Sequence, residues 1–217
     1  MKETKDYLQI LRNDMHSVVM ATADKQGHPV TRVIDIMLVD DTALYFLTAR
    51  GKDFYEQLMH DPYIALTGMC GGEGMDAKEA SLHKKAISIH GKAESIGKEK
   101  LDEIFEKNPY MASIYPDPLS RQALEVFHMT EGRGEFFDLF TKPITRANFH
   151  IGLNTDTESK PAYFISDKCM GCGKCVSVCP QKCIVSDTVQ YVIQQEHCLH
   201  CGNCFTDCPV NAVLHEA

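Results

Sequence analysis

Apolar, β-branched and aromatic residues along the first two thirds of the chain gather in short runs separated by turn residues. These runs are 17–23, 30–39, 43–48, 63–69, 85–96, 124–129 and 135–140. Runs of this length and composition are typical of β-strands. Gly27 and Pro29 lie between the first two runs, and Asp40-Asp41 lies before the third, which predicts hairpin connections.

Three other segments place their apolar residues at helical spacing. Residues 3–15 do so with Tyr7, Leu8, Leu11 and Met15, and residues 52–60 and 98–107 repeat the pattern. About six hairpin-linked strands interrupted by short helices favour a closed antiparallel barrel. The sequence therefore predicts a mainly β first domain over residues 1–150.

The remaining third of the chain has a different character. Residues 151–162 are polar and include Pro161, which is typical of a linker. Residues 163–217 form a small second domain that holds the only internal repeat. Its apolar content is too low for an independent core, so bound metal must supply much of its folding free energy.

The repeat is the most specific motif of the chain. It reads Cys-x-x-Cys-x-x-Cys-x-x-x-Cys-Pro and occurs twice, ending at Pro180 and at Pro209. Three closely spaced thiolates can wrap one face of an iron–sulfur cubane, while the fourth, followed by proline, reaches across to the other cluster. The spacing predicts two [4Fe–4S] clusters. One is held by Cys169, Cys172, Cys175 and Cys208, and the other by Cys198, Cys201, Cys204 and Cys179.

Two other uses of these cysteines fit the pattern less well. Structural zinc prefers two Cys pairs separated by a longer loop and has no use for a third Cys at the same spacing. A disulfide framework belongs to small secreted chains. Cys70 and Cys183 lie outside the pattern, and we expect both to be small buried residues and not ligands.

Charge and hydropathy exclude other classes of protein. The net charge is −8 and the isoelectric point is near 5.6, without a basic patch, which argues against a nucleic-acid partner. No run of apolar residues approaches the length of a membrane span, and the N-terminus lacks the apolar core of a signal peptide. We expect no membrane partner and a cytoplasmic location, where thiols stay reduced.

Both parts resemble known families. Residues 163–217 resemble a bacterial two-[4Fe–4S] ferredoxin throughout, including the apolar pairs Ile184-Val185 and Ala212-Val213. Residues 1–150 resemble the FMN-binding split barrel of the pyridoxamine 5′-phosphate oxidase-like superfamily. That resemblance is carried by residues 27–34, 44–52, 61–66 and 90–94. It implies a split β-barrel followed by a small α+β ferredoxin-type domain.

The barrel resemblance also implies a cofactor site and a homodimer with FMN at the subunit interface. By similarity the FMN phosphate would lie against Arg32, Arg50, Gly51 and Lys52, and the ribityl chain and ring edge against Val33, Ile34, Asp35, Leu47 and Thr48. Guanidinium and ammonium donors on rigid elements suit a phosphate dianion. The plainer alternative is that these basic residues are ordinary surface charges.

The sequence departs from the oxidase that names the superfamily. A linker and a ferredoxin stand where the oxidase has its substrate-binding tail, so pyridoxal phosphate synthesis has no support here. Ala86 also stands where the oxidase tends to carry a glutamine that contacts the flavin.

A flavin exchanges electrons singly or in pairs, whereas clusters handle single electrons, so the two together can convert one mode into the other. The leading hypothesis is an FMN-dependent oxidoreductase that moves electrons between the clusters and FMN and reduces a small acceptor. A second hypothesis is an electron carrier without a substrate that docks to a redox partner protein. A third is a barrel that binds haem or a deazaflavin. No catalytic residue is assigned, although His83 and His90 lie near the expected flavin strands.

Overall fold

The computed structural model describes residues 2–152, 162–187 and 190–215. Most of the predicted linker, residues 153–161, therefore lies outside the described residues. The chain divides into two compact units. The first comprises Met1–Cys70, Ala86–Phe136 and Asn148–Thr155, and the second comprises Gly71–Lys85, Phe137–Ala147 and Asp156–Ala217. The second unit thus contains the cysteine repeat together with two segments from the part of the chain predicted to form the barrel.

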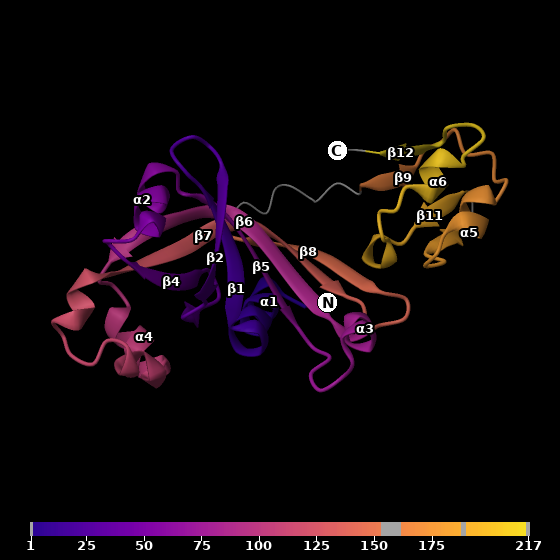
Figure 1. Cartoon of the computed structure of the whole chain (residues 1–217). Coiled ribbons are helices and arrows are strands. Elements are labelled where there is room, and N and C mark those ends of the chain that lie inside the picture. Colours follow the sequence, from indigo (N-terminus) through magenta and orange to yellow (C-terminus); the bar gives the residue numbers. More distant parts are fainter. Residues whose placement is uncertain (1, 153–161, 188–189, 216–217) are drawn as a thin grey trace. The chain divides into compact units, whose positions relative to one another are not determined.

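The main sheet has eight strands, and it confirms the prediction of a mainly β split barrel (Figure 1). Its strand order is β2-β1-β5-β6-β7-β4-β3, and β8 also pairs with β7. The strands are β1 (Ser17–Ala23), β2 (Pro29–Asp35), β3 (Leu38–Val39), β4 (Leu44–Ala49), β5 (Tyr63–Cys70), β6 (Lys85–Gly97), β7 (Leu124–Asp138) and β8 (Thr145–Ile151). Strand β1 pairs antiparallel with β2 and β5, and β4 pairs antiparallel with β3 and β7.

Short helices connect these strands. Helix α1 (Thr4–Ile10) begins with a capping box between Glu3 and Asp6 and continues as a π-helical turn, Leu11–Met15. Helices α2 (Asp53–His60) and α4 (Leu101–Lys107) lie at the other two places where the sequence predicts a helix. Helix α3 (Ala77–Ala80) and short 3₁₀ turns at 81–83, 109–113 and 120–123 complete the connections. None of the described helices is long and apolar enough to cross a membrane.

The strands differ from the sequence prediction in three places. The predicted strand 30–39 breaks into β2 and β3, and the two predicted strands 124–129 and 135–140 are one continuous strand, β7. The third difference is β8, which the pattern of apolar residues does not predict. Glycine explains the second difference, because a Cβ on Gly134 would lie 2.2 Å from the ring of Phe149 on β8. This glycine permits close packing of neighbouring strands and does not form a turn.

The barrel core is aromatic and aliphatic. The rings of Phe46 and Phe127 are stacked with centroids 5.7 Å apart, and Phe54 of α2 lies against Phe46 at 5.9 Å. Strand β5 alternates buried Ile64 and Leu66 with exposed residues, as a strand with one buried face should. A second group of buried side chains joins β3 and β4 to α4: Met37, Leu38, Ala43, Tyr45, Leu101, Ile104, Phe105, Met111, Leu124 and Val126.

The cysteine-rich part of the second unit consists of two similar halves. Strand β9 (Tyr163–Ile165) pairs antiparallel with β12 (Val213–His215), and β10 (Ile184–Ser186) pairs antiparallel with β11 (Tyr191–Ile193). Helix α5 (Lys174–Val178) follows the first cysteine run and α6 (Asn203–Thr206) follows the second. This is the small α+β ferredoxin-type arrangement expected from the sequence.

Candidate functional site: two cysteine-lined cavities and a basic corner of the barrel

Two cavities in the second unit are lined by the repeated cysteines. A cavity of about 310 Å³ is lined by Cys169, Cys172, Cys175 and Cys208. We call it the outer cavity, because its ligands begin and end the repeat. The structure thus brings the last cysteine of the second run to the first run, as the crossed assignment expects.

The other cavity, the inner cavity, has a volume of about 340 Å³. It is lined by Cys198, Cys201, Cys204 and Cys179, which is the second predicted set of four. It is also lined by Cys183. Within the described ranges no three His, Cys, Asp or Glu side chains converge closely enough to hold one metal ion. The sulfurs are instead spread around each cavity.

The backbone brings the cysteines to these cavities in the same way twice. Gly173 precedes α5 and Gly202 precedes α6, with φ of +72° and +79°. A Cβ at these glycines would lie 3.1 Å and 3.2 Å from the hydroxyl oxygens of Tyr191 and Tyr163. Glycine is therefore needed for the left-handed backbone at both turns, and space there is also limited.

The protonation of the thiols depends on their surroundings. Burial, together with the nearby charge of Cys198, raises the pKa of Cys204 to about 11. At Cys208 burial acts in the same direction, but backbone N–H groups that face the sulfur outweigh it and lower the pKa. One of these is the amide of Ala212, 3.1 Å from Cys208 Sγ. Because iron binds thiolates, assembly at the inner cavity must displace protons from buried thiols.

In the barrel, Arg32 lies against α2. Its guanidinium donates to Thr22 Oγ1 and to Gln57 Oε1, both at 2.6 Å, and lies 4.4 Å from the ring centroid of Phe54. Burial lowers the pKa of Arg32, although a guanidinium remains charged. Arg32 is thus held beside the first turn of the helix.

Lys52 and Gly51 lie at the same end of α2. Lys52 is the N-cap residue of the helix, and the space where a Cβ of Gly51 would lie is open. Free N–H groups at a helix start, together with two basic side chains, form an arrangement that suits a phosphate. The guanidinium of Arg50 donates instead to the carbonyl of Gln122 at 2.8 Å.

Thr48 has a buried hydroxyl without a hydrogen-bond partner among the described residues. Thr48 is only 3% exposed and lies opposite Glu125 in the β4–β7 ladder. A buried hydroxyl needs a partner, so this atom is suited to contact a bound polar group. Together with the basic end of α2, it makes the residues present compatible with FMN.

The other residues expected at the flavin are not all on one face. Leu47 packs against the apolar group between β4 and α4, on the opposite face of β4 from Thr48. Val33 is 67% exposed on the outer face of β2, while Arg32 and Ile34 point to the other face. The nine residues predicted to contact the flavin therefore lie in several different environments and do not form one continuous surface.

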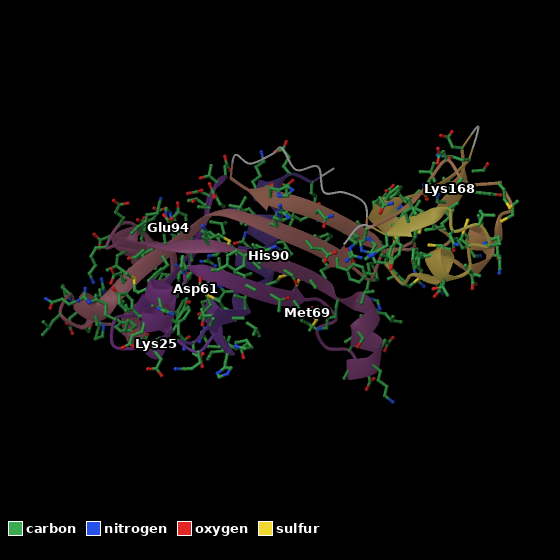
Figure 2. All side chains as sticks on the ribbon, turned by 90° about the horizontal axis from the view of Figure 1, so that it is seen from above. Lys25, Asp61, Met69, His90, Glu94 and Lys168 are labelled. Carbon is green, nitrogen blue, oxygen red and sulfur yellow. The ribbon has the colours of Figure 1, made fainter. Side chains whose placement is uncertain are left out.

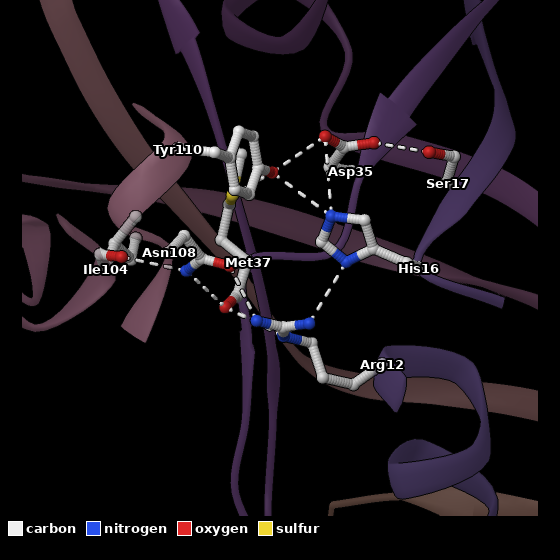
Figure 3. A network of polar contacts seen from close by, with 8 residues as sticks. All are labelled: Arg12, His16, Ser17, Asp35, Met37, Ile104, Asn108 and Tyr110. Carbon is white, nitrogen blue, oxygen red and sulfur yellow. Dashed lines mark hydrogen bonds and ion pairs between the residues drawn. The ribbon is translucent and has the colours of Figure 1, made fainter. Parts of the chain in front are cut away.

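Asp35 lies in a separate polar network at the end of β2 (Figure 3). Its carboxylate accepts hydrogen bonds from Ser17 at 2.6 Å and Tyr110 at 2.8 Å, and lies 3.5 Å from His16 Nε2. Burial would raise the pKa of Asp35, but the hydrogen bonds from Ser17 and Tyr110 and the charge of Arg12 lower it below its usual value. Burial and the bond to Asp35 raise the pKa of Tyr110 to about 12.

Arg12 supports this network from the π-helical turn. Its guanidinium donates to the Met37 carbonyl at 3.0 Å, to Asn108 Oδ1 at 2.6 Å and to His16 Nδ1 at 3.0 Å. Because a guanidinium has no acceptor, Nδ1 of His16 must carry the lone pair. The ring proton of neutral His16 is thereby directed from Nε2 to Tyr110, 3.1 Å away.

Several of these residues could not be chosen from the sequence. Thr22 and Gln57 hold Arg32 from distant segments, and only the helical spacing of Gln57 from Phe54 gave a signal. His16 has an unusual φ of +55° that the sequence does not reveal. Cys183 lies outside the repeated motif, so the cysteine spacing does not predict its place at the inner cavity.

Comparisons with known proteins decide the family. The family model for pyridoxamine 5′-phosphate oxidase matches residues 4–135. The chain belongs to this family. A second model, for the 4Fe-4S dicluster domain, matches residues 168–212. This member of the pyridoxamine 5′-phosphate oxidase family therefore carries an added iron–sulfur domain, and together the two parts describe a redox protein.

Individual relatives match only the barrel part. The dihydrophenazinedicarboxylate synthase of Pseudomonas chlororaphis is 31% identical over 110 residues, which are 51% of this chain and 45% of that protein. The pyridoxine/pyridoxamine 5′-phosphate oxidase of Mycobacterium sp. (strain JLS) is 25% identical over 135 residues, 59% of this chain and 60% of that protein. This family member spans about half the length of the curated relatives it matches.

Solved structures agree on the fold. A nimC/nimA family protein from Clostridium acetobutylicum aligns with a TM-score of 0.53 and 18% identity, covering 67% of this chain and 90% of that one. At this level of identity the likeness concerns the fold alone. It agrees with the split barrel that the family model indicates.

Proposed function

We propose that this protein is an FMN-dependent oxidoreductase that uses two [4Fe–4S] clusters to pass single electrons to or from FMN and reduces a small acceptor. The observation that carries the proposal is the crossed arrangement of eight cysteines around two cavities in a chain whose barrel belongs to a flavin-binding family. When bound, the clusters supply single electrons and the flavin supplies single or paired electron transfer.

The chain's own residues would bind and orient these groups. Arg32, Lys52 and the first turn of α2 would hold the FMN phosphate, and the buried hydroxyl of Thr48 would gain a hydrogen-bond partner. The cysteines of the outer and inner cavities would each hold one cluster. Because thiolate ligands require reduced cysteines, we propose that the protein works in the cytoplasm.

The proposal is tested with the full chain purified without oxygen. Denaturation should release FMN, identified by its absorbance and mass, and iron analysis should give about eight iron atoms per chain. The reduced protein should then be reoxidised by a small acceptor, such as a quinone or a nitroaromatic compound, with no second protein present. Release of haem or a deazaflavin would overturn the choice of FMN.

A second candidate is an electron carrier that docks to a partner enzyme. The acidic balance of the chain favours it, because a net charge of −8 would steer the protein to a basic surface. Reoxidation that occurs only after a cell extract is added, and that weakens as salt is raised, would favour the carrier over the enzyme.

We further propose that the protein is a homodimer joined through the outer face of β1, β2 and β5. Val19, Val33, Tyr63 and Met69 are exposed on this face, and Val19 is paired directly with Val33. Met69 lies on β5, and His90 lies on the neighbouring strand β6 (Figure 2). Exposed apolar residues that lie together on one face commonly mark an interface.

Light scattering on Val33→Glu/Met69→Glu tests the homodimer. The variant should be a monomer if this face joins two copies. Lys92→Glu on β6 is the matched control, since it adds negative charge without removing an apolar contact. A wild-type monomer at micromolar concentration would contradict the proposal.

A further inference from the structure

Cys183 is the feature of the inner cavity that the two-cluster assignment leaves unused. Its Sγ lies 3.5 Å from Cys179 Sγ, and Cys183 is only 2% exposed. It lines the same cavity as Cys198, Cys201 and Cys204. The inner cavity therefore has five cysteines, whereas a [4Fe–4S] cluster takes four.

The two halves of the repeat show that this fifth cysteine is a departure from an otherwise matched backbone. Lys182 and Asn211 have φ of +52° and +51°, and their amides donate to the carbonyls of Cys179 and Cys208 at 3.2 Å and 3.3 Å. The following residue is Cys183 in one half and Ala212 in the other. The outer cavity thus has a methyl group where the inner cavity has a thiol.

The surrounding contacts hold both positions in the same way. The carbonyl of Cys183 accepts from the amide of Gln194 at 2.8 Å, and the carbonyl of Ala212 accepts from the amide of Ser166 at 2.8 Å. Because the backbones correspond, the side chain at position 183 is directed to its cavity just as Ala212 lines the outer one. A cysteine at either position would reach the cavity.

We propose that Cys183 is an alternative ligand position at the inner cavity, able to bind the iron that Cys179 holds. The exchange balances without an oxidant. The Cys183 thiol would lose its proton as its sulfur bound iron, the bond from iron to Cys179 would break, and the Cys179 thiolate would take up a proton. The outer cavity has no such alternative. This inference rests on the two-cluster part of the proposed function and not on the flavin.

Single and double variants of the full chain, reconstituted without oxygen, test the inference. Cys179→Ala should keep close to the wild-type iron content of about eight atoms per chain and both reduced-cluster EPR signals. Cys179→Ala/Cys183→Ala and Cys208→Ala should each lose part or all of one cluster. The matching gain-of-function variant is Cys208→Ala/Ala212→Cys, which adds a cysteine at the outer cavity. It should recover the iron lost in Cys208→Ala.

Each possible result of these experiments either supports or overturns the proposal that Cys183 is an alternative ligand. The proposal is overturned if Cys179→Ala loses as much iron as Cys208→Ala, or if removing Cys183 from Cys179→Ala changes nothing. Should Cys179→Ala not accumulate, Cys179→Ser with and without Cys183→Ala gives the same comparison, and identical EPR spectra would contradict the proposal. A wild-type chain without clusters would instead count against the proposed function itself.

Discussion

The barrel and the cysteine-rich part reach a folded state by different means. The buried group between β4 and α4 consists entirely of hydrophobic side chains, such as Leu124 and Ile104. In the cysteine-rich part, four of the seven buried core residues are cysteines: Cys175, Cys183, Cys198 and Cys204. The difference shows that the barrel can bury enough apolar surface on its own, whereas the other part depends on what its sulfurs bind.

Iron removal should produce the largest difference between the two parts of the protein. Chelation of reduced protein should unfold residues 162–215, because their core loses the bonds that close it. The barrel should keep its thermal transition. Heteronuclear NMR of the apoprotein measures both effects, and dispersed amide signals from Tyr163, Ile184 and Val213 without iron would contradict the expectation.

A substitution in the barrel core should destabilise the barrel and leave the cysteine-rich part unaffected. Phe46 is fully buried, so Phe46→Ala should lower the free energy of unfolding of the barrel by about 3–5 kcal/mol. The iron content and EPR signals should stay unchanged. Denaturant unfolding followed by circular dichroism measures the loss, and Leu119→Ala, at a position 73% exposed, is the control.

Arg32→Ala should act on the flavin and leave both folds intact. If Arg32 binds the FMN phosphate as proposed, removing its guanidinium should weaken FMN binding by about tenfold to a hundredfold, as expected for a charge-assisted hydrogen bond. Fluorescence titration of the flavin-free protein measures this affinity. Lys25→Ala is the control, because Lys25 is an exposed surface cation. Equal affinity of the two variants for FMN would show that Arg32 does not bind the phosphate.

The smallest expected effect is the acid sensitivity of the barrel. The folded state holds the pKa of Asp35 below its usual value, so the carboxylate stabilises the fold above the unfolded pKa. That stability is lost as the pH falls through the lower, folded pKa. In apoprotein, Asp35→Asn should cost roughly 1 kcal/mol at neutral pH and flatten the decline below about pH 4. A parallel decline in both proteins would show that Asp35 does not contribute.

The two parts also differ in how far the sequence reveals them. The ligand sets of the cavities follow from the chemistry of closely spaced thiolates, and the structure gathers each set of four around one cavity. The flavin residues were harder to place, because adjacent strand residues face opposite ways, as Leu47 and Thr48 do. The predicted break between strands 124–129 and 135–140 is wrong, because the role of Gly134 depends on Phe149, which belongs to a different strand.

The crossed cysteines have a further consequence for the chain as a polymer. All cysteines that line the inner cavity lie in the sequence between Cys175 and Cys208, which line the outer cavity. The chain segment that an inner cluster would close is therefore contained within the segment that an outer cluster would close. Closing a loop costs less entropy when the loop is shorter. A cluster at the inner cavity would tie residue 179 to residue 198 and would shorten the length of chain that the outer cluster must still close. We therefore expect the inner cluster to form first, which time-resolved EPR during reconstitution of the Cys208→Ala and wild-type chains can measure.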